Sequence, residues 1–269
     1  MKKGLLLAID IGNTNMEFGI IEEGKLKANF RLGTNRDVTS DEVGLLVAQF
    51  FAIQGIERTA IKDIIITSVV PQVMYSISNM IKKYFGGKVP LIVGDNIPFP
   101  IKNLYDNPKE VGADRLVAAI AAYRKYGGPA IVVDFGTATT FDAVDADGAY
   151  LGGSIYPGIK ISMDALFQKA AKLPRVELVD PGTVIGRNTV QSMQAGAVYG
   201  YVGAVKNIVG LMRVHLGEKT RVIATGGLSK MIGRQSGLFD YIDKALTLDG
   251  LAMIYDMYME EKEGNKELE

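Results

Sequence analysis

Short apolar runs alternate with amphipathic stretches along the whole chain. Runs rich in aliphatic and β-branched residues predict strands at 5–9, 63–69, 89–93, 131–133 and 221–225. Apolar residues at helical spacing predict helices over 41–54, 72–84, 112–126, 162–172, 189–216 and 251–260. Strands that alternate with helices are typical of an α/β fold.

The chain also contains two copies of one local pattern. In each copy a buried strand ends in an Asp-x-Gly turn, and a second strand then leads to a Glu-Gly or Asp-Gly hairpin turn. The matched pairs, all at an offset of 124 positions, are Asp10 with Asp134, Gly12 with Gly136, and Gly24 with Gly148. A repeat at nearly half the chain length predicts a duplicated α/β unit.

The amino-acid composition excludes several kinds of partner and catalytic chemistry. The chain has 269 residues, a formal net charge of zero, no Cys and a single His, His215. Zero net charge argues against nucleic acid as a partner. The absence of Cys excludes disulfides, thiolate nucleophiles and Cys-ligated metals. Catalysis and ligand binding must therefore rely on carboxylates, hydroxyls, Lys, Arg and backbone N–H groups. Because we find neither a secretory signal nor a membrane-spanning run, we expect a cytoplasmic protein without membrane contact.

The two Asp-x-Gly turns are candidate phosphate sites. Glycine lets backbone N–H groups approach an anion closely, and Asn13 and Thr14 in one turn and Thr137 and Thr139 in the other add side-chain donors. The strand-end carboxylates Asp10 and Asp134 are suited to hold cations. A third candidate turn is Thr225-Gly-Gly, with Gly226 and Gly227. The alternative for each Asp-x-Gly turn is a plain β-turn with a capping Asp, and for the third turn an ordinary strand-to-helix turn. No P-loop is present, and no GxGxxG motif follows the first strand.

The ordered set of motifs resembles the type III pantothenate kinase family. The segments that carry the resemblance are DIGNT at 10–14, GADR at 112–115, DFGTATT at 134–140, GGSIYPG at 152–158, LPRV at 173–176, IGRNT at 185–189 with Gly196 following, and TGG at 225–227. The resemblance covers about residues 5–258. Glu17 departs from the family pattern, where an apolar or neutral residue is expected.

The resemblance implies two duplicated ribonuclease-H-like (actin-like ATPase) domains with a nucleotide cleft between them. We expect these domains at 1–115 and 116–258, followed by a charged tail at 259–269 that frays from about Glu260. The implied activity is transfer of the γ-phosphoryl group of ATP to pantothenate, with Mg²⁺ and a monovalent cation, K⁺ or NH₄⁺. The implied assembly is a homodimer whose pantothenate site is completed across the interface.

Residue roles follow from the same resemblance. Asp114 is the candidate general base, and Arg115 would bind the pantothenate carboxylate. Tyr105, Gly112 and Thr189 would also contact the substrate. Asp10 would hold Mg²⁺, and Gly12, Asn13, Thr14, Gly136, Thr137, Thr139, Gly226 and Gly227 would surround ATP, while Asp134 would hold the monovalent cation.

Each role has a structural alternative. Asp114 and Thr189 could each simply cap a helix, since both residue types are favoured at helix starts. Arg115 could be a surface residue, and Tyr105 a loop aromatic. Two functional alternatives also stay open: a kinase of the same superfamily with another small hydroxylated substrate, and an ATP-binding regulatory protein without kinase activity.

Overall fold

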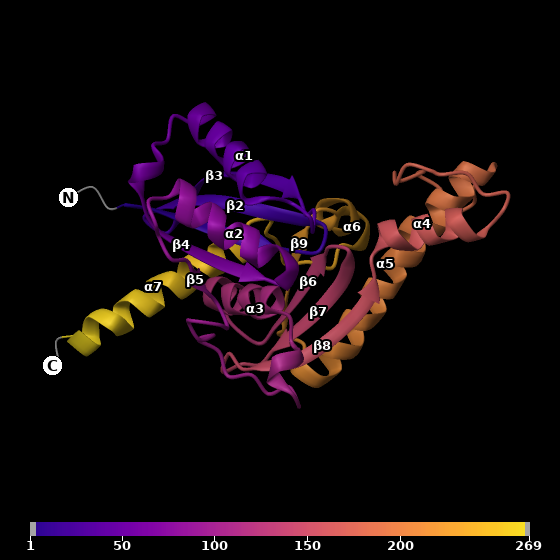
Figure 1. The fold of residues 1–269 in the computed structure, drawn as a ribbon. Coiled ribbons are helices and arrows are strands. Elements are labelled where there is room, and N and C mark those ends of the chain that lie inside the picture. The colour runs from indigo at the N-terminus through magenta and orange to yellow at the C-terminus, as the bar shows by residue number, and fades with distance from the viewer. Residues whose placement is uncertain (1–3, 267–269) are drawn as a thin grey trace. The chain divides into compact units, whose positions relative to one another are not determined.

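The computed structural model describes residues 4–266. Contacts divide the chain into two compact units. The first unit takes in the chain up to Ile101, Lys109–Ala121 and the chain from Ala245 onward; the second takes in Lys102–Pro108 and Ala122–Lys244. Each unit holds a mixed sheet with helices, so the predicted α/β class is confirmed (Figure 1).

The first unit has a five-stranded sheet in the order β3-β2-β1-β4-β5. Its strands are β1 (Leu5–Ile11), β2 (Asn15–Glu22), β3 (Lys25–Gly33), β4 (Ile61–Ser68) and β5 (Leu91–Ile92). The central strand β1 pairs antiparallel with β2 and parallel with β4. The helical elements of this part of the chain are α1 (Ser40–Ile53), η1 (Arg58–Ala60), α2 (Pro71–Tyr84), η2 (Pro108–Glu110), α3 (Ala113–Tyr126) and α7 (Leu246–Lys266). α3 contributes residues to both units.

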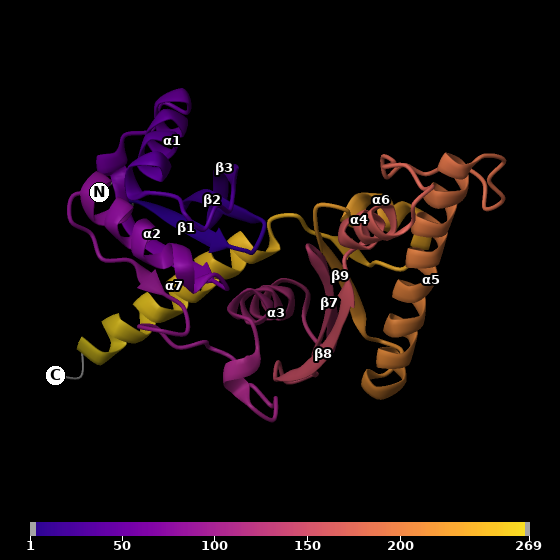
Figure 2. The same cartoon turned by 45° about the vertical axis from the view of Figure 1, so that its right-hand side comes forward.

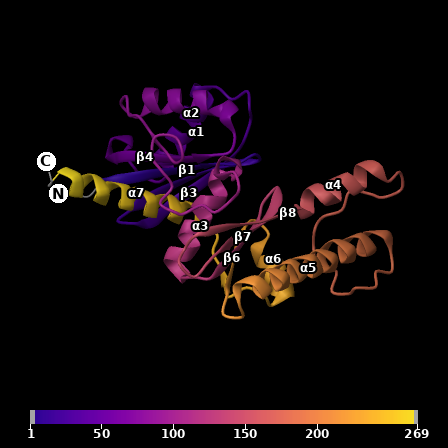
Figure 3. The same cartoon turned by 90° about the horizontal axis from the view of Figure 1, so that it is seen from below.

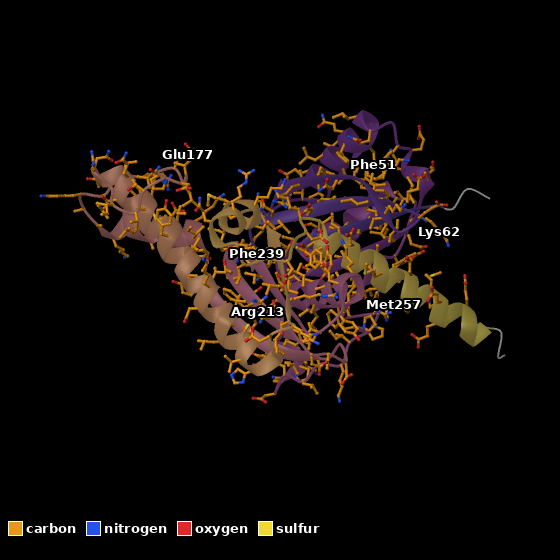
Figure 4. All side chains as sticks on the ribbon, turned by 180° about the vertical axis from the view of Figure 1, so that it is seen from behind. Phe51, Lys62, Glu177, Arg213, Phe239 and Met257 are labelled. Carbon is orange, nitrogen blue, oxygen red and sulfur yellow. The ribbon has the colours of Figure 1, made fainter. Side chains whose placement is uncertain are left out.

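Period-two alternation in β1 builds a core on each face of this sheet. Ile9 and Ile11 join a cluster with α1 and α2, which includes Phe51 (labelled in Figure 4). Leu6 and Ala8 face the opposite way and join a cluster with α3 and α7. Figure 3 shows α1 and α2 on one side of the first sheet and α7 on the other.

The second unit repeats this topology, with strand order β10-β9-β6-β7-β8. Its elements are β6 (Ala130–Phe135), β7 (Ala138–Val144), β8 (Tyr150–Pro157), α4 (Ile159–Lys169), α5 (Thr189–Leu216), β9 (Arg221–Gly226), α6 (Ser229–Ser236) and β10 (Tyr241–Ile242). α5 is the long helix of Figure 2. Val205 of α5, Ile232 of α6 and Phe239 (Figure 4) pack against the side chains of β6 that include Ile131 and Val133.

The shared strand order confirms the duplication, but the two copies are not in register throughout. In the first copy Asp10 pairs with Glu17, whereas in the second Asp134 pairs with Thr140. The loop before β7 is one residue shorter than the loop before β2, so β7 is shifted by one position against the 124-residue offset. A one-residue shift in a strand moves each side chain to the other face of the sheet.

Several element bounds differ from the sequence prediction. β3 and β8 were not predicted as separate strands, and α4 begins at Ile159 rather than 162. The last helix begins at Leu246 and continues through Lys266, so the expected fraying from Glu260 is not observed; 267–269 lie outside the described residues. The predicted domain ranges 1–115, 116–258 and 259–269 stay a prediction.

Candidate functional site

In the first unit, the loop between β1 and β2 carries Gly12, Asn13 and Thr14. The Gly12 N–H donates to the Asn15 carbonyl oxygen at 3.0 Å, which closes the turn. Thr34, just after β3, braces it twice: its N–H donates to the Thr14 carbonyl at 2.9 Å and its hydroxyl to the Gly12 carbonyl at 2.7 Å. Asn13 and Thr14 are exposed at the tip, as a ligand-binding turn requires.

Asp114 lies in the first turn of α3, where partial helix-dipole charge favours an anion. Its Oδ1 accepts the Arg115 N–H at 2.8 Å. Because α3 begins at Ala113, Asp114 lies inside the helix and not at the N-cap position that the capping alternative gave it. A Cβ on Gly112 would lie 2.7 Å from Asp114 Oδ1, which explains the glycine. Burial raises the pKa of the Asp114 carboxyl, and the hydrogen bond and positive charge from Arg115 oppose that rise.

Asp10 and Asp114 lie at the same end of the same sheet face. By strand alternation Asp10 shares the face of Leu6 and Ala8, which α3 covers. Gly112 lies close to Val69, whose N–H bonds the Ile11 carbonyl at the end of β1. The first unit therefore brings the first glycine loop, Asp10 and the start of α3 together.

Glu17, the departure from the family pattern, lies directly opposite Asp10 on β2. Its carboxylate accepts hydrogen bonds from Asn29 at 2.8 Å and from Arg31 at 2.6 Å, both on β3. The ion pair with Arg31 compensates the charge of Glu17 next to Asp10. Cross-strand pairing therefore puts Glu17 beside the candidate site.

In the second unit, the loop between β6 and β7 carries Gly136 and Thr137. The Gly136 N–H donates to the Ala138 carbonyl at 3.1 Å, and Gly158 at the end of β8 donates to the Thr137 carbonyl at 3.1 Å. A Cβ on Gly158 would clash with that carbonyl. Gly158 stands 124 positions after Thr34, and its N–H makes the same closing bond in the second copy.

Asp134 lies at the end of β6, against the end of β9. Gly226 has a φ of +85°, and a Cβ there would clash with the Oδ1 of Asp134 and the backbone of Phe135. Only glycine permits this approach without strain. Gly227 has open space around its Cα. The structure thus brings Asp134, Gly136, Thr137 and Gly226 together.

The two neighbouring threonines of β7 face opposite ways. Thr139 is 1% exposed, pairs with Phe135 and shares a hydrogen bond with Tyr201 of α5. Because Tyr201 donates its proton to the Pro157 carbonyl at 3.2 Å, Thr139 is the donor in their bond, and its single proton is used there. Thr140 pairs with Asp134 and shares its face. Sequence reasoning chose Thr139 and missed Thr140, because alternation shows that the two face opposite ways but not which one faces Asp134.

The remaining predicted residues of the second unit lie in two further places. The ring of Tyr105 packs near Tyr150, with ring centroids 6.5 Å apart, and over Gly152. Thr189 is the first residue of α5 and is exposed, and Asn188 is the N-cap, accepting the Gln191 N–H at 2.9 Å. The capping alternative for Thr189 is therefore wrong.

Comparison with known proteins decides the family. The family model described as type III pantothenate kinase matches residues 6–210. A protein named type III pantothenate kinase from Moorella thermoacetica is 48% identical over 252 residues, which is 94% of this chain and 99% of the relative. This chain belongs to the type III pantothenate kinase family.

Solved structures of other proteins share the fold of this member of the type III pantothenate kinase family. A Campylobacter jejuni protein assigned to the Baf family of transcriptional activators matches with a TM-score of 0.56 at 20% identity, covering 94% of this chain and 98% of that one. The ethanolamine utilization protein EutJ from Carboxydothermus hydrogenoformans also matches with a TM-score of 0.56, at 15% identity, covering 94% and 91%. The predicted two-part fold of the actin-like ATPase class is confirmed.

The donor groups at the two strand-end carboxylates fit hard cations. Across residues 4–266 no cluster of three or more His, Cys, Asp or Glu side chains is placed to hold a metal ion, so a cation at Asp10 or Asp134 would need further oxygen ligands of another kind. Beside Asp10, the buried hydroxyl of Thr67 has no hydrogen-bond partner within the described part of the chain. Thr225 occupies the equivalent position beside Asp134. Carboxylate and hydroxyl oxygens suit Mg²⁺ and K⁺.

Within the same range, no helix combines the length and the apolar character that a membrane crossing demands.

Proposed function

We propose that this pantothenate kinase transfers the γ-phosphoryl group of ATP to the terminal hydroxyl of pantothenate, with Asp114 as the general base. The product, 4'-phosphopantothenate, is the first intermediate toward coenzyme A. The observation that carries the base assignment is the position of Asp114: a partly buried carboxylate at the start of α3, on the sheet face and at the sheet end of Asp10.

Phosphoryl transfer requires mainly that the protein position the reactants and neutralise their charge. Asp114 accepts the proton of the attacking hydroxyl, and its raised pKa makes it a stronger base than an exposed Asp. Arg115 binds the pantothenate carboxylate, for which a guanidinium offers two parallel donors. The N–H groups and hydroxyls at Gly12, Asn13, Thr14, Gly136 and Thr137 hold phosphate oxygens, with Gly226 and Gly227 beside the nucleotide.

Two cations complete the proposal. Asp10 holds Mg²⁺ and Asp134 holds a monovalent cation, K⁺ or NH₄⁺; bound there, they neutralise charge on the phosphates. Thr139 as a further phosphate contact stays a prediction. Its hydroxyl proton is donated to Tyr201 and is therefore not available to a phosphate oxygen.

A homodimer is part of the proposal. Large apolar side chains are exposed along α4 and α5, among them Ile161, Leu166, Phe167, Val190, Leu211 (60% exposed) and Val214 (77% exposed). Exposed apolar side chains that gather into a contiguous patch are characteristic of protein interfaces. Pantothenate would lie between Asp114, Arg115 and Tyr105 of one subunit and Thr189 of the partner subunit. A cytoplasmic location likewise stays a prediction.

The test is ADP release by the purified protein with ATP, Mg²⁺ and K⁺, with and without pantothenate. We expect pantothenate to be required and the product to be 4'-phosphopantothenate by mass spectrometry. ADP release that pantothenate does not accelerate would contradict the assignment. Replacing K⁺ by Na⁺ tests the monovalent cation separately, since equal rates would remove that role from Asp134.

The non-catalytic alternative, an ATP-binding regulator, is not favoured. The likeness to a Baf family transcriptional activator rests on a 20% identical structure and shows the fold alone. The Moorella thermoacetica relative, at 48% identity over nearly the whole chain, is named as the kinase.

A further inference from the structure

A buried carboxylate of the second unit has no part in the site described above. Asp142, in the middle of β7, is only 1% exposed. Burying a carboxylate costs several kcal/mol unless hydrogen bonds or charges compensate it. The first copy has Gly19 at the corresponding strand position, two residues after Glu17, so the duplication does not account for Asp142.

One oxygen of Asp142 is bound by the threonine opposite Asp134. The Thr140 hydroxyl donates to Asp142 Oδ2 at 3.0 Å. Residues directly opposite in an antiparallel pair have Cβ atoms roughly 5 Å apart, so Thr140 lies within reach of whatever Asp134 binds. A threonine hydroxyl has one proton; since Asp142 takes it, the Thr140 oxygen offers only lone pairs to a further partner. Lone pairs are what a cation requires.

The other oxygen of Asp142 is bound by Tyr150, whose hydroxyl donates to Oδ1 at 2.8 Å. Tyr150 is fully buried at the start of β8. Its backbone pairs with the preceding loop: its N–H donates to the Lys102 carbonyl at 2.9 Å, and its carbonyl accepts the Leu104 N–H at 2.9 Å. Tyr105 follows immediately, with its ring beside that of Tyr150.

We propose that Asp142 is a positioning residue that links the cation end of the site to its substrate end, by holding the Thr140 oxygen toward the cation at Asp134 and Tyr150 beneath Tyr105. The proposal rests on the proposed function, which places K⁺ at Asp134 and pantothenate at Tyr105. It adds Thr140 as a ligand for the monovalent cation.

Three variants separate the two ends of this link. Thr140→Val should raise the K⁺ concentration for half-maximal activity on the order of tenfold, as expected for losing one interaction with a charged group, and should leave the KM for pantothenate nearly unchanged. Tyr150→Phe should raise the KM for pantothenate and leave K⁺ activation nearly unchanged. Asp142→Asn should change both, since its amide cannot accept both hydroxyl protons.

A thermal-shift titration gives a readout that does not need turnover. Adding K⁺ should raise the melting temperature of the wild type in the presence of ADP, and this rise should be smaller for Thr140→Val and Asp142→Asn but unchanged for Tyr150→Phe. This arm stands even if pantothenate proves not to be the substrate, so the two failures are distinguishable.

Matched controls keep loss of stability apart from loss of function. Thr220→Val removes a buried threonine hydroxyl bonded at 2.6 Å to the Gly217 carbonyl, and Tyr126→Phe removes a tyrosine hydroxyl bonded at 2.8 Å to Asp243; neither touches the link. Both should lower the melting temperature without moving the K⁺ response. The proposal is overturned if Asp142→Asn behaves as these controls do, or if Thr140→Val binds K⁺ as the wild type does.

Discussion

The two glycine loops share one backbone frame but are supported differently. In both copies the third strand ends with an N–H that closes the loop, from Thr34 in the first and from Gly158 in the second. Opposite the strand-end carboxylate, however, the first copy has Glu17, paired with the half-exposed Arg31, and the second has Thr140, bonded to the buried Asp142.

This difference shows how duplicated units diverge while their topology is kept. The Glu17–Arg31 ion pair opposite Asp10 has a half-exposed partner, so its strength is sensitive to salt. The hydrogen bond from Thr140, opposite Asp134, ends on the buried Asp142, so it depends on both partners being present. The first unit also carries Asp114, so the proposed base belongs to one copy. Four variants test this contrast.

The largest effect is expected for Asp114→Asn in the first unit. If Asp114 is the base, kcat should fall by about 10²–10⁴-fold while ATP still binds, as checked by steady-state kinetics and calorimetry. Asp41→Asn, which removes an exposed carboxylate bonded to Lys83 on the same unit, should keep full activity. Full activity of Asp114→Asn would show that Asp114 serves only the start of α3 and is not the base.

Asp114→Asn should lower activity without lowering stability. Because burial raises the folded-state pKa of Asp114 above its ordinary value, protonation of this group favours folding: its contribution is fully present at low pH and is lost as pH rises through the raised pKa. At neutral pH the neutral Asn should therefore leave the melting temperature unchanged or higher. The acid limb of the wild-type kcat/KM profile, which reports the free enzyme, should correspondingly lie above the usual range for Asp.

Gly158→Ala should have the next largest effect, on the second loop. Its Cβ would clash with the Thr137 carbonyl, and relieving such overpacking costs about 1–3 kcal/mol in free energy of unfolding. We expect a lower urea midpoint and weaker ATP binding. Gly33→Ala, at a position with open space, is the control and should change neither. An unchanged ATP affinity in Gly158→Ala would separate this closing bond from nucleotide binding.

Thr34→Val removes the brace that only the first loop has. The lost hydroxyl bond to the Gly12 carbonyl is worth about 0.5–1.5 kcal/mol, so the KM for ATP should rise several-fold with little change in kcat. Thr34→Ser keeps the hydroxyl and should restore the wild-type KM. A fall in kcat with an unchanged KM would show that the brace acts in the chemical step instead.

Glu17→Gln should have the smallest effect. An ion pair with a half-exposed partner is worth at most about 1 kcal/mol, so the free energy of unfolding should change little, and the difference should shrink at high salt. Glu22→Gln, which breaks the exposed pair with Lys27, is the matched control. A change in Mg²⁺ dependence for Glu17→Gln alone would show that the charge opposite Asp10 matters to the cation.

The amino-acid pattern alone was enough for the class of fold and the duplication, and it named the residues of the candidate site. Periodicity located the central strands and the long helices, because burial on one face leaves a regular trace. Asp-x-Gly turns and the GADR segment pointed to Asp10, Asp134 and Asp114, because short motifs keep residues that are local in the chain.

Contacts between distant segments needed the folded chain. Glu17 lies beside Asp10, and Thr140 rather than Thr139 beside Asp134, because pairing register is set by loop lengths that a fixed offset hides. The link from Thr140 through Asp142 to Tyr150 crosses two strands, and its members become neighbours only when β7 and β8 pair. Neighbouring residues of a strand point to opposite faces of the sheet and so have different surroundings. Which of two neighbours faces the site is therefore decided by the tertiary structure.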